Sequence, residues 1–166
     1  METHRNSGFL LALTLLAVTV ILSIVAYVLW YKLLFFVGSY LFIHWLGLTA
    51  TAFVAVSIPI HYVLKRKKPQ TFKKLLRIHV FGNLVAFLLI SIHFAQNFGR
   101  LAGAFQRLGT GFALYMLLSL IVATGIVEKY QSNDKVPRYI KAIHKYAVVI
   151  FYLLILVHLL EGFNIL

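Results

Sequence analysis

The sequence predicts an all-α membrane protein, a bundle of five transmembrane helices with the N-terminus inside and the C-terminus outside. The chain of 166 residues is 61% hydrophobic, whereas about half is usual in soluble domains. Apolar runs of about 20 residues, the length that crosses a bilayer, fill nearly all of it. We therefore expect a single membrane domain over residues 1–166. The expected spans are about 9–31, 40–64, 75–98, 110–128 and 139–163.

The first apolar run follows Arg5 and has the charge pattern of a secretory signal peptide. It is too long for the hydrophobic region of such a peptide, and it ends in AYVLWYK rather than in a small-residue cleavage site. We expect it to be retained as a membrane span.

Several classes of chemistry have no residues to support them. The chain contains no cysteine, so it can form no disulfide, no thiolate-held iron–sulfur cluster and no covalent CxxCH haem attachment. No glycine-rich dinucleotide fingerprint or P-loop is present in the sequence. The loops between the runs are short, and we therefore expect any chemistry inside the bundle or at its two faces.

The basic residues predict the orientation of the spans. The net charge is +12, and residues 65–77 and 129–145 hold most of the Lys and Arg. Together with Arg5 these segments fall on one side of the predicted topology, and loops rich in Lys and Arg stay cytoplasmic. Contact with anionic lipid headgroups accounts for most of these charges, because they lie at helix ends. We expect no nucleic-acid partner.

The third and fifth runs each carry two histidines, His79 with His93 and His144 with His158. Both pairs are 14 residues apart, which on a helix places the two rings within about 40° of each other and about 21 Å apart along the axis. In the predicted topology both runs cross from inside to outside. His79 and His144 then lie near the cytoplasmic surface, and His93 and His158 near the outer one.

If these two helices face each other, each level holds two imidazoles, which are the axial ligands of a six-coordinate haem b. Neutral imidazole binds haem iron well, and ligation removes the cost of a bare nitrogen in hydrocarbon. A lone membrane histidine more often bonds a neighbouring helix, but four in matched pairs favour ligation. A proton relay would need carboxylates, which the spans almost lack, and zinc would need clustered ligands. We therefore predict two haem b groups.

Several neighbouring residues fit this prediction. Gly82, three residues after His79, either would let a porphyrin approach the helix or is an ordinary small residue at a helix contact. Phe87 and Phe151 lie about midway between the two levels. Basic residues near each level could pair with haem propionates, with Arg77 and Arg100 the best candidates. The full set is Arg77, Lys141 and Lys145 inside, and Arg100 and Arg107 outside.

The second run holds His44 and His61, 17 residues apart and so on roughly perpendicular faces. They cannot form a third stripe of ligands. His44 lies at the predicted outer level beside Trp45, where it either belongs to an interfacial aromatic belt or lines a pocket for an electron acceptor. We expect His61, near the basic loop, to be interfacial.

The segments LLRIHVFGNLVAFLLISIHFA and YIKAIHKYAVVIFYLLILVHLLEG resemble the third and fifth helices of the ferric reductase-like transmembrane superfamily. This superfamily includes ferric reductases, NADPH oxidases and the haem subunit of bacterial methionine sulfoxide repair. The resemblance covers the chain from about residue 40 onward. It implies an inner haem on His79 and His144, an outer haem on His93 and His158, and electron flow from a cytosolic flavin to an outside acceptor.

From residues 1–166 we expect five spans rather than the family's usual six, and no flavin or nicotinamide domain. We therefore expect a separate donor, either a cytosolic flavoprotein reductase or a membrane quinol, and an extracytoplasmic acceptor such as ferric iron, oxygen, superoxide or a partner protein. The expected location is a cell membrane, most simply the cytoplasmic membrane of a prokaryote. A quinone-linked cytochrome b subunit and a cofactor-free membrane anchor stay open as alternatives, and whether the chain is itself an oxidoreductase stays undecided.

Overall fold

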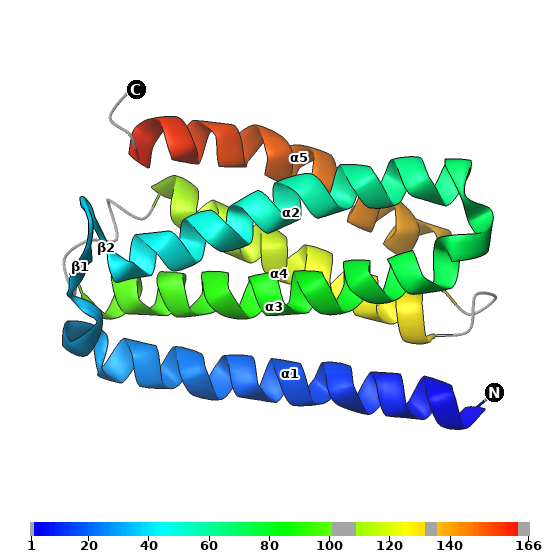
Figure 1. The fold of residues 1–166 in the computed structure, drawn as a ribbon, viewed down its shortest axis with the longest axis horizontal. Coiled ribbons are helices and arrows are strands. Elements are labelled where there is room, and N and C mark those ends of the chain that lie inside the picture. The colour runs from blue at the N-terminus through cyan, green and yellow to red at the C-terminus, as the bar shows by residue number, and fades with distance from the viewer. Residues whose placement is uncertain (1, 101–108, 132–135, 163–166) are drawn as a thin grey trace. The chain divides into compact units, whose positions relative to one another are not determined.

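The structure, a computed structural model, describes residues 2–100, 109–131 and 136–162. Within these residues it contains five helices long and apolar enough to cross a membrane, so the predicted helical membrane fold is confirmed (Figure 1). The helices are α1 (Glu2–Val28), α2 (Phe42–Lys67), α3 (Phe72–Gly99), α4 (Gly109–Tyr130) and α5 (Arg138–Gly162), with two 3₁₀ turns at Trp30–Leu33 and Pro69–Thr71.

The helices form because an apolar solvent leaves backbone N–H and C=O groups no partner outside the segment. Three hydroxyl groups within the spans are satisfied inside their own helix. Thr14, Thr19 and Ser119 each donate to the carbonyl oxygen four residues earlier, at 2.8–3.0 Å. Pro59 lies inside α2, which continues through it to Lys67. Such a proline is tolerated in membrane helices, where neighbouring groups satisfy the freed backbone.

The connection between α1 and α2 differs from the prediction. The first span was expected to reach residue 31 and the second to begin at residue 40. Instead α1 ends at Val28, and strands β1 (Phe36–Val37) and β2 (Tyr40–Leu41) form a short antiparallel hairpin. Gly38 allows the tight turn because its φ is +62°, and the Trp45 indole donates to the Val37 carbonyl at 2.8 Å. The predicted bounds depended on apolar character alone. Residues 29–31 and 40–41 are apolar, so the prediction included them in the spans although they lie outside α1 and α2.

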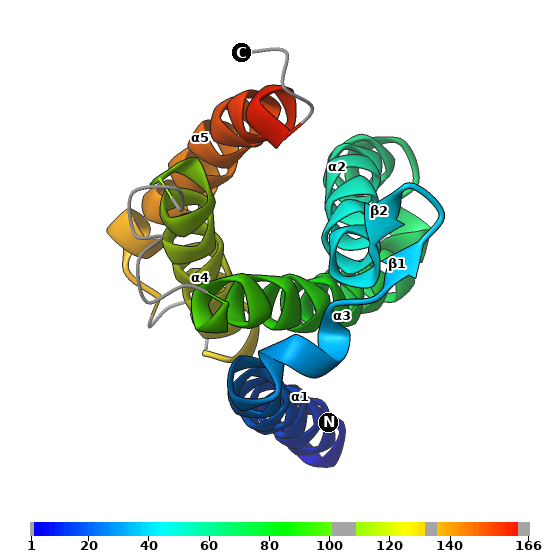
Figure 2. The same ribbon diagram turned by 90° about the vertical axis from the view of Figure 1, so that its left-hand side faces the viewer.

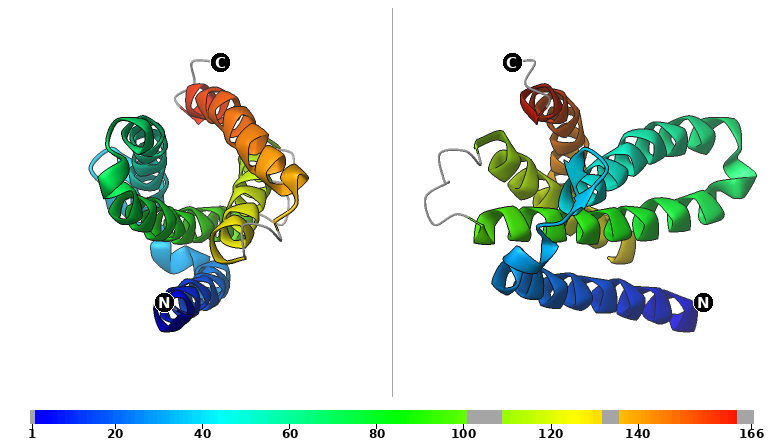
Figure 3. Two further views of the ribbon diagram at one scale, coloured as in Figure 1. Left: turned by 90° about the vertical axis from the view of Figure 1, so that its right-hand side faces the viewer. Right: turned by 60° about the vertical axis from the view of Figure 1, so that its left-hand side comes forward.

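The chain divides into two compact units, Met1–Leu101 and Ala102–Leu166, and each is described by itself. In the first unit, α3 lies between α1 and α2 and packs against both, as Figures 2 and 3 show from both ends. The approach of α1 to α3 is close: a Cβ atom on Gly99 would lie 2.5 Å from the Tyr27 carbonyl oxygen. The Tyr27 and Phe98 rings pack beside it, with centroids 6.0 Å apart.

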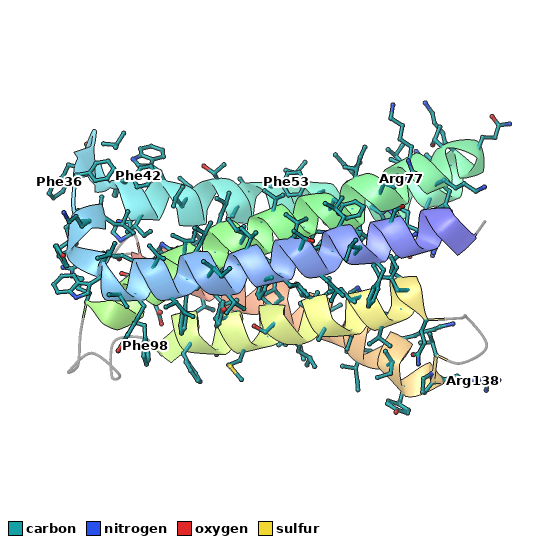
Figure 4. All side chains as sticks on the ribbon, turned by 90° about the horizontal axis from the view of Figure 1, so that it is seen from below. Phe36, Phe42, Phe53, Arg77, Phe98 and Arg138 are labelled. Carbon is teal, nitrogen blue, oxygen red and sulfur yellow. The ribbon has the colours of Figure 1, made fainter. Side chains whose placement is uncertain are left out.

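The two ends of the first unit differ in chemistry. The end where α2 joins α3 carries most of the basic side chains, including Arg77, whereas Phe36 and Phe42 lie at the other end (Figure 4). The Lys and Arg residues around that α2–α3 connection are Lys65, Arg66, Lys67, Lys68, Lys73, Lys74 and Arg77. The second unit consists of α4 packed along α5. Among its described residues, the basic side chains are those of Lys129, Arg138, Lys141 and Lys145, at the end of α4 and the beginning of α5.

Candidate functional site

His79 is held by side chains of α2 and α3. Its Nδ1 lies 3.1 Å from Nδ2 of Asn83, one helical turn later, and Ser57 of α2 donates to Oδ1 of Asn83 at 3.2 Å. As placed, the amide donates to the ring. If the amide oxygen and nitrogen of Asn83 are exchanged, both bonds reverse. The amide nitrogen then donates to the Ser57 hydroxyl, which can also accept, and His79 Nδ1–H donates to the amide oxygen. The Ser57–Asn83–His79 chain therefore accommodates either ring tautomer.

The ring of His61 on α2 stacks on His79, with centroids 4.4 Å apart and planes 22° apart. Its Nδ1 is buried and has no hydrogen-bond partner among the described residues. This contact was not expected from the sequence, because 17-residue spacing along α2 says nothing about which α3 residue lies opposite. Stacked rings place their nitrogens side by side rather than converging on one point, so this pair does not have the geometry of a two-histidine metal site.

His93 is held by the backbone of α2. Its Nδ1 lies 2.9 Å from the carbonyl oxygen of Ile43, which can only accept, so Nδ1 carries the proton. Gly47, one turn after Ile43, makes room for this bond: a Cβ atom there would lie 3.1 Å from the His93 ring. The neutral ring in this tautomer has its lone pair on Nε2. His44 of α2 is a neighbour of this ring: the ring centroids of His44 and His93 are 5.9 Å apart.

His144, in the second unit, is held by α4. Its Nδ1 lies 3.0 Å from the Thr124 hydroxyl and 3.1 Å from the Ile121 carbonyl oxygen. Because the carbonyl only accepts, Nδ1 again carries the proton. Gly125 follows Ile121 by one turn, and a Cβ atom there would lie 3.1 Å from Cε1 of His144. This is the arrangement seen at His93, with Ile121 and Gly125 in place of Ile43 and Gly47.

His158 is held by Thr110 of α4, whose hydroxyl oxygen lies 3.0 Å from the ring Nδ1. The same hydroxyl donates its only proton to the carboxylate of Glu161, at 2.5 Å. It must therefore accept from His158, which again puts the proton on Nδ1. Gly111 lies beneath the ring, where a Cβ atom would be 3.3 Å from Cε1.

The four rings thus meet the requirement of a metal-bound imidazole. A ligating histidine donates its second ring N–H to an acceptor that fixes its tautomer and orientation. His93, His144 and His158 do so from Nδ1, and the Asn83 amide allows it at His79. Among the described residues no group of three or more His, Cys, Asp or Glu could hold a metal ion. Haem iron held by two imidazoles needs no such group.

The other predicted site residues have varied surroundings. Gly82 provides space for Phe53 of α2, whose ring a Cβ atom would overlap, and its role in porphyrin approach stays a prediction. Phe87 and Phe151 are buried. Arg100 caps α3 and interacts electrostatically with His44. Lys145 lies 6.0 Å from the ring centroid of Tyr146. Arg107 lies outside the described residues.

Sequence reasoning missed the residues that support the rings. One signal was available: Thr-Gly occurs at residues 110–111 and again at 124–125, 14 residues apart, as are the two histidines of α5. Comparisons with protein-family models, with curated proteins and with solved structures gave no match for this chain. The resemblance to the ferric reductase-like superfamily stays a prediction.

Proposed function

We propose that the chain is a b-type di-haem cytochrome that moves electrons across a membrane. His79 and His144 would hold the iron of an inner haem, and His93 and His158 that of an outer haem. The observation that carries this proposal is the support of the four rings. Each Nδ1 is engaged by a neighbour, which places the lone pair of a neutral imidazole on Nε2, the atom that would bind a metal; at His79 this holds with the Asn83 amide in its exchanged orientation.

The orientation follows from the charges of each unit taken separately. In the first unit His79 belongs to the end of α3 nearest the basic α2–α3 connection, and His93 to the opposite end. In the second unit His144 follows Arg138 and Lys141 at the start of α5, and His158 lies near its other end. The positive-inside rule therefore gives the same order in both units, with His79 and His144 on the cytoplasmic side.

The protein would bind and orient its cofactors and exclude other ligands from them. If two histidines held each iron, no position would be open to a substrate, which would favour outer-sphere transfer. Haem supplies the one-electron redox chemistry when bound. We propose a separate cytosolic flavoprotein reductase or a membrane quinol as donor, and an extracytoplasmic acceptor. The resemblance to the ferric reductase-like superfamily, in which a cytosolic flavin supplies the electrons, supports the flavoprotein as donor.

The haem content and visible spectrum of the purified protein test the proposal. Expressed with ample haem, the protein should show sharp low-spin b-type bands on reduction and about two haems per chain. His44→Ala and His61→Ala are matched controls, because these histidines also lie in a span but are not proposed ligands; both variants should keep two haems. Folded, colourless protein would contradict the proposal.

The electron donor needs a second experiment. Reduction of the haems by a quinol analogue, without any flavoprotein, would identify the membrane pool as donor. Reduction only when a flavin reductase and its nicotinamide substrate are added would identify the cytosolic route.

A further inference from the structure

Helix α4 repeats one dipeptide at the spacing of the α5 histidines. Thr110-Gly111 and Thr124-Gly125 are 14 residues apart, as are His144 and His158. At each repeat the threonine hydroxyl lies 3.0 Å from a histidine Nδ1, and the glycine leaves room for the ring. Helix α4 therefore holds both α5 rings by the same pair of residues.

The two threonines nevertheless pass their protons to different acceptors. The Thr124 hydroxyl donates to backbone carbonyl oxygens, of Leu120 at 2.7 Å and Ile121 at 3.1 Å. The Thr110 hydroxyl donates to the carboxylate of Glu161. A hydrogen bond to an ionised acceptor is roughly twice as strong as one between neutral groups. Hydrogen bonds in a chain also polarise one another.

We infer that Thr110 and Glu161 are positioning residues that make His158 a more electron-donating ligand than His144. The carboxylate draws the Thr110 proton, which strengthens the bond that Thr110 accepts from His158 Nδ1–H and raises the basicity of Nε2. A more basic imidazole stabilises ferric iron, so the haem held by His158 is harder to reduce than it would be without Glu161. This inference rests on the proposed function.

Redox titration of the holoprotein tests the inference. Glu161→Gln keeps an oxygen that accepts from Thr110 but removes the charge. We expect the equilibrium constant for reducing one haem to rise about tenfold, or about 59 mV for one electron. The other haem should not change. Thr110→Val, which removes the relay, should raise the same potential, whereas Thr110→Ser should keep the wild-type value.

A double variant separates the relay from the simple field of a nearby carboxylate. If Glu161 acts through Thr110, Glu161→Gln should have little further effect in the Thr110→Val background. A full effect in that background would overturn the inference. Glu128→Gln is a charge-matched control on α4, and Thr124→Val should shift only the haem held by His144. Equal shifts of both haems in Glu161→Gln would also overturn it.

Nitrogen NMR of protein labelled at histidine gives a readout that needs no haem. Haem-free protein should show His158 as the Nδ1–H tautomer, assigned by its absence in His158→Ala, and Thr110→Val should change that signal but not that of His144. An Nε2–H tautomer at His158 would contradict the relay. Colourless protein with the expected tautomer would instead contradict the di-haem function while leaving the hydrogen-bonded relay in place.

Discussion

The two units support their histidines in different ways. In the second unit, α4 uses one repeated dipeptide, and each ring of α5 meets a threonine hydroxyl and a glycine. In the first unit, His93 meets a backbone carbonyl beside Gly47, whereas His79 meets the Asn83 amide, which Ser57 supports. Helix α2 also brings a second imidazole beside each ring, His44 near His93 and His61 against His79.

This difference teaches that equal spacing of candidate ligands does not require equal surroundings. What the rings share is the use of Nδ1 for support, achieved with a carbonyl, an amide or a hydroxyl. The extra histidines of α2 raise a sharper question. The stacked rings of His61 and His79 do not converge on one point, but if His44 were the functional partner of His93, the first unit would hold a cofactor without α5. The proposed function requires the opposite, and ligand variants can decide between them.

The largest expected effect is the loss of a whole haem. His158→Ala, in the second unit, should reduce the content from about two haems per chain to about one, and His93→Ala, in the first unit, should remove the same haem. Redox titration identifies which haem remains. If His158→Ala left a His93-dependent haem intact while His44→Ala removed it, the first unit would hold its cofactor alone and the comparison would reverse.

The next largest effect should come from the glycines beneath two of the rings. Gly47→Val and Gly125→Val each add a side chain whose Cβ atom alone would lie 3.1 Å from a histidine ring. Displacing the ring should break its Nδ1 bond and weaken haem retention by about 10–100-fold. Haem transfer to an excess of apomyoglobin measures this. Gly109→Val is the control, because no atom of the described residues lies within 4 Å of its Cβ position. If Gly47→Val and Gly125→Val retained haem as well as Gly109→Val does, the role of these two glycines would be contradicted.

Much of the fold was readable from the sequence because bilayer thickness fixes the length of an apolar run. Helices α2, α3, α4 and α5 each begin and end within three residues of the predicted span. The first helix begins earlier, because polar residues from Glu2 continue it. The hairpin at Phe36–Val37 and Tyr40–Leu41 escaped prediction since its residues are as apolar as those of the neighbouring helices.

The candidate ligands were found from spacing along single helices, but their supports depend on contacts between helices. Nothing in the sequence aligns Ile43 of α2 with His93 of α3, so that bond could not be predicted. The Thr-Gly repeat of α4 was predictable in principle, because its 14-residue period equals that of His144 and His158. Gly82 shows the opposite limit: its sequence position left two roles open, porphyrin approach or an ordinary helix contact. The structure shows the contact, with Phe53, and the role in porphyrin approach stays a prediction.

A moderate effect on stability should follow from filling the space at Gly82. The Cβ atom of Gly82→Ala would overlap the Phe53 ring, and overpacking of this kind costs about 1–3 kcal/mol. Denaturant unfolding in detergent, followed for the haem-free protein, measures the change in the free energy of unfolding. Phe53→Leu should partly restore stability in the double variant. A Gly82→Ala protein of normal stability that binds less haem would instead support the predicted role in porphyrin approach.

The smallest effect is expected where the support of a ring is indirect. Ser57→Ala removes the hydroxyl that anchors Asn83, not the group that contacts His79, whereas Thr124→Val removes the hydroxyl that contacts His144 itself. Both rings are proposed ligands of the same haem, so one redox titration compares them directly. We expect Ser57→Ala to cost about 0.5–1.5 kcal/mol of stability, the value of one hydrogen bond, and to shift the potential less than Thr124→Val does. Without Ser57, the Asn83 amide can present either its nitrogen or its oxygen to the His79 ring. A larger shift in potential for Ser57→Ala than for Thr124→Val would therefore mean that the amide must be held in one orientation to fix the His79 tautomer.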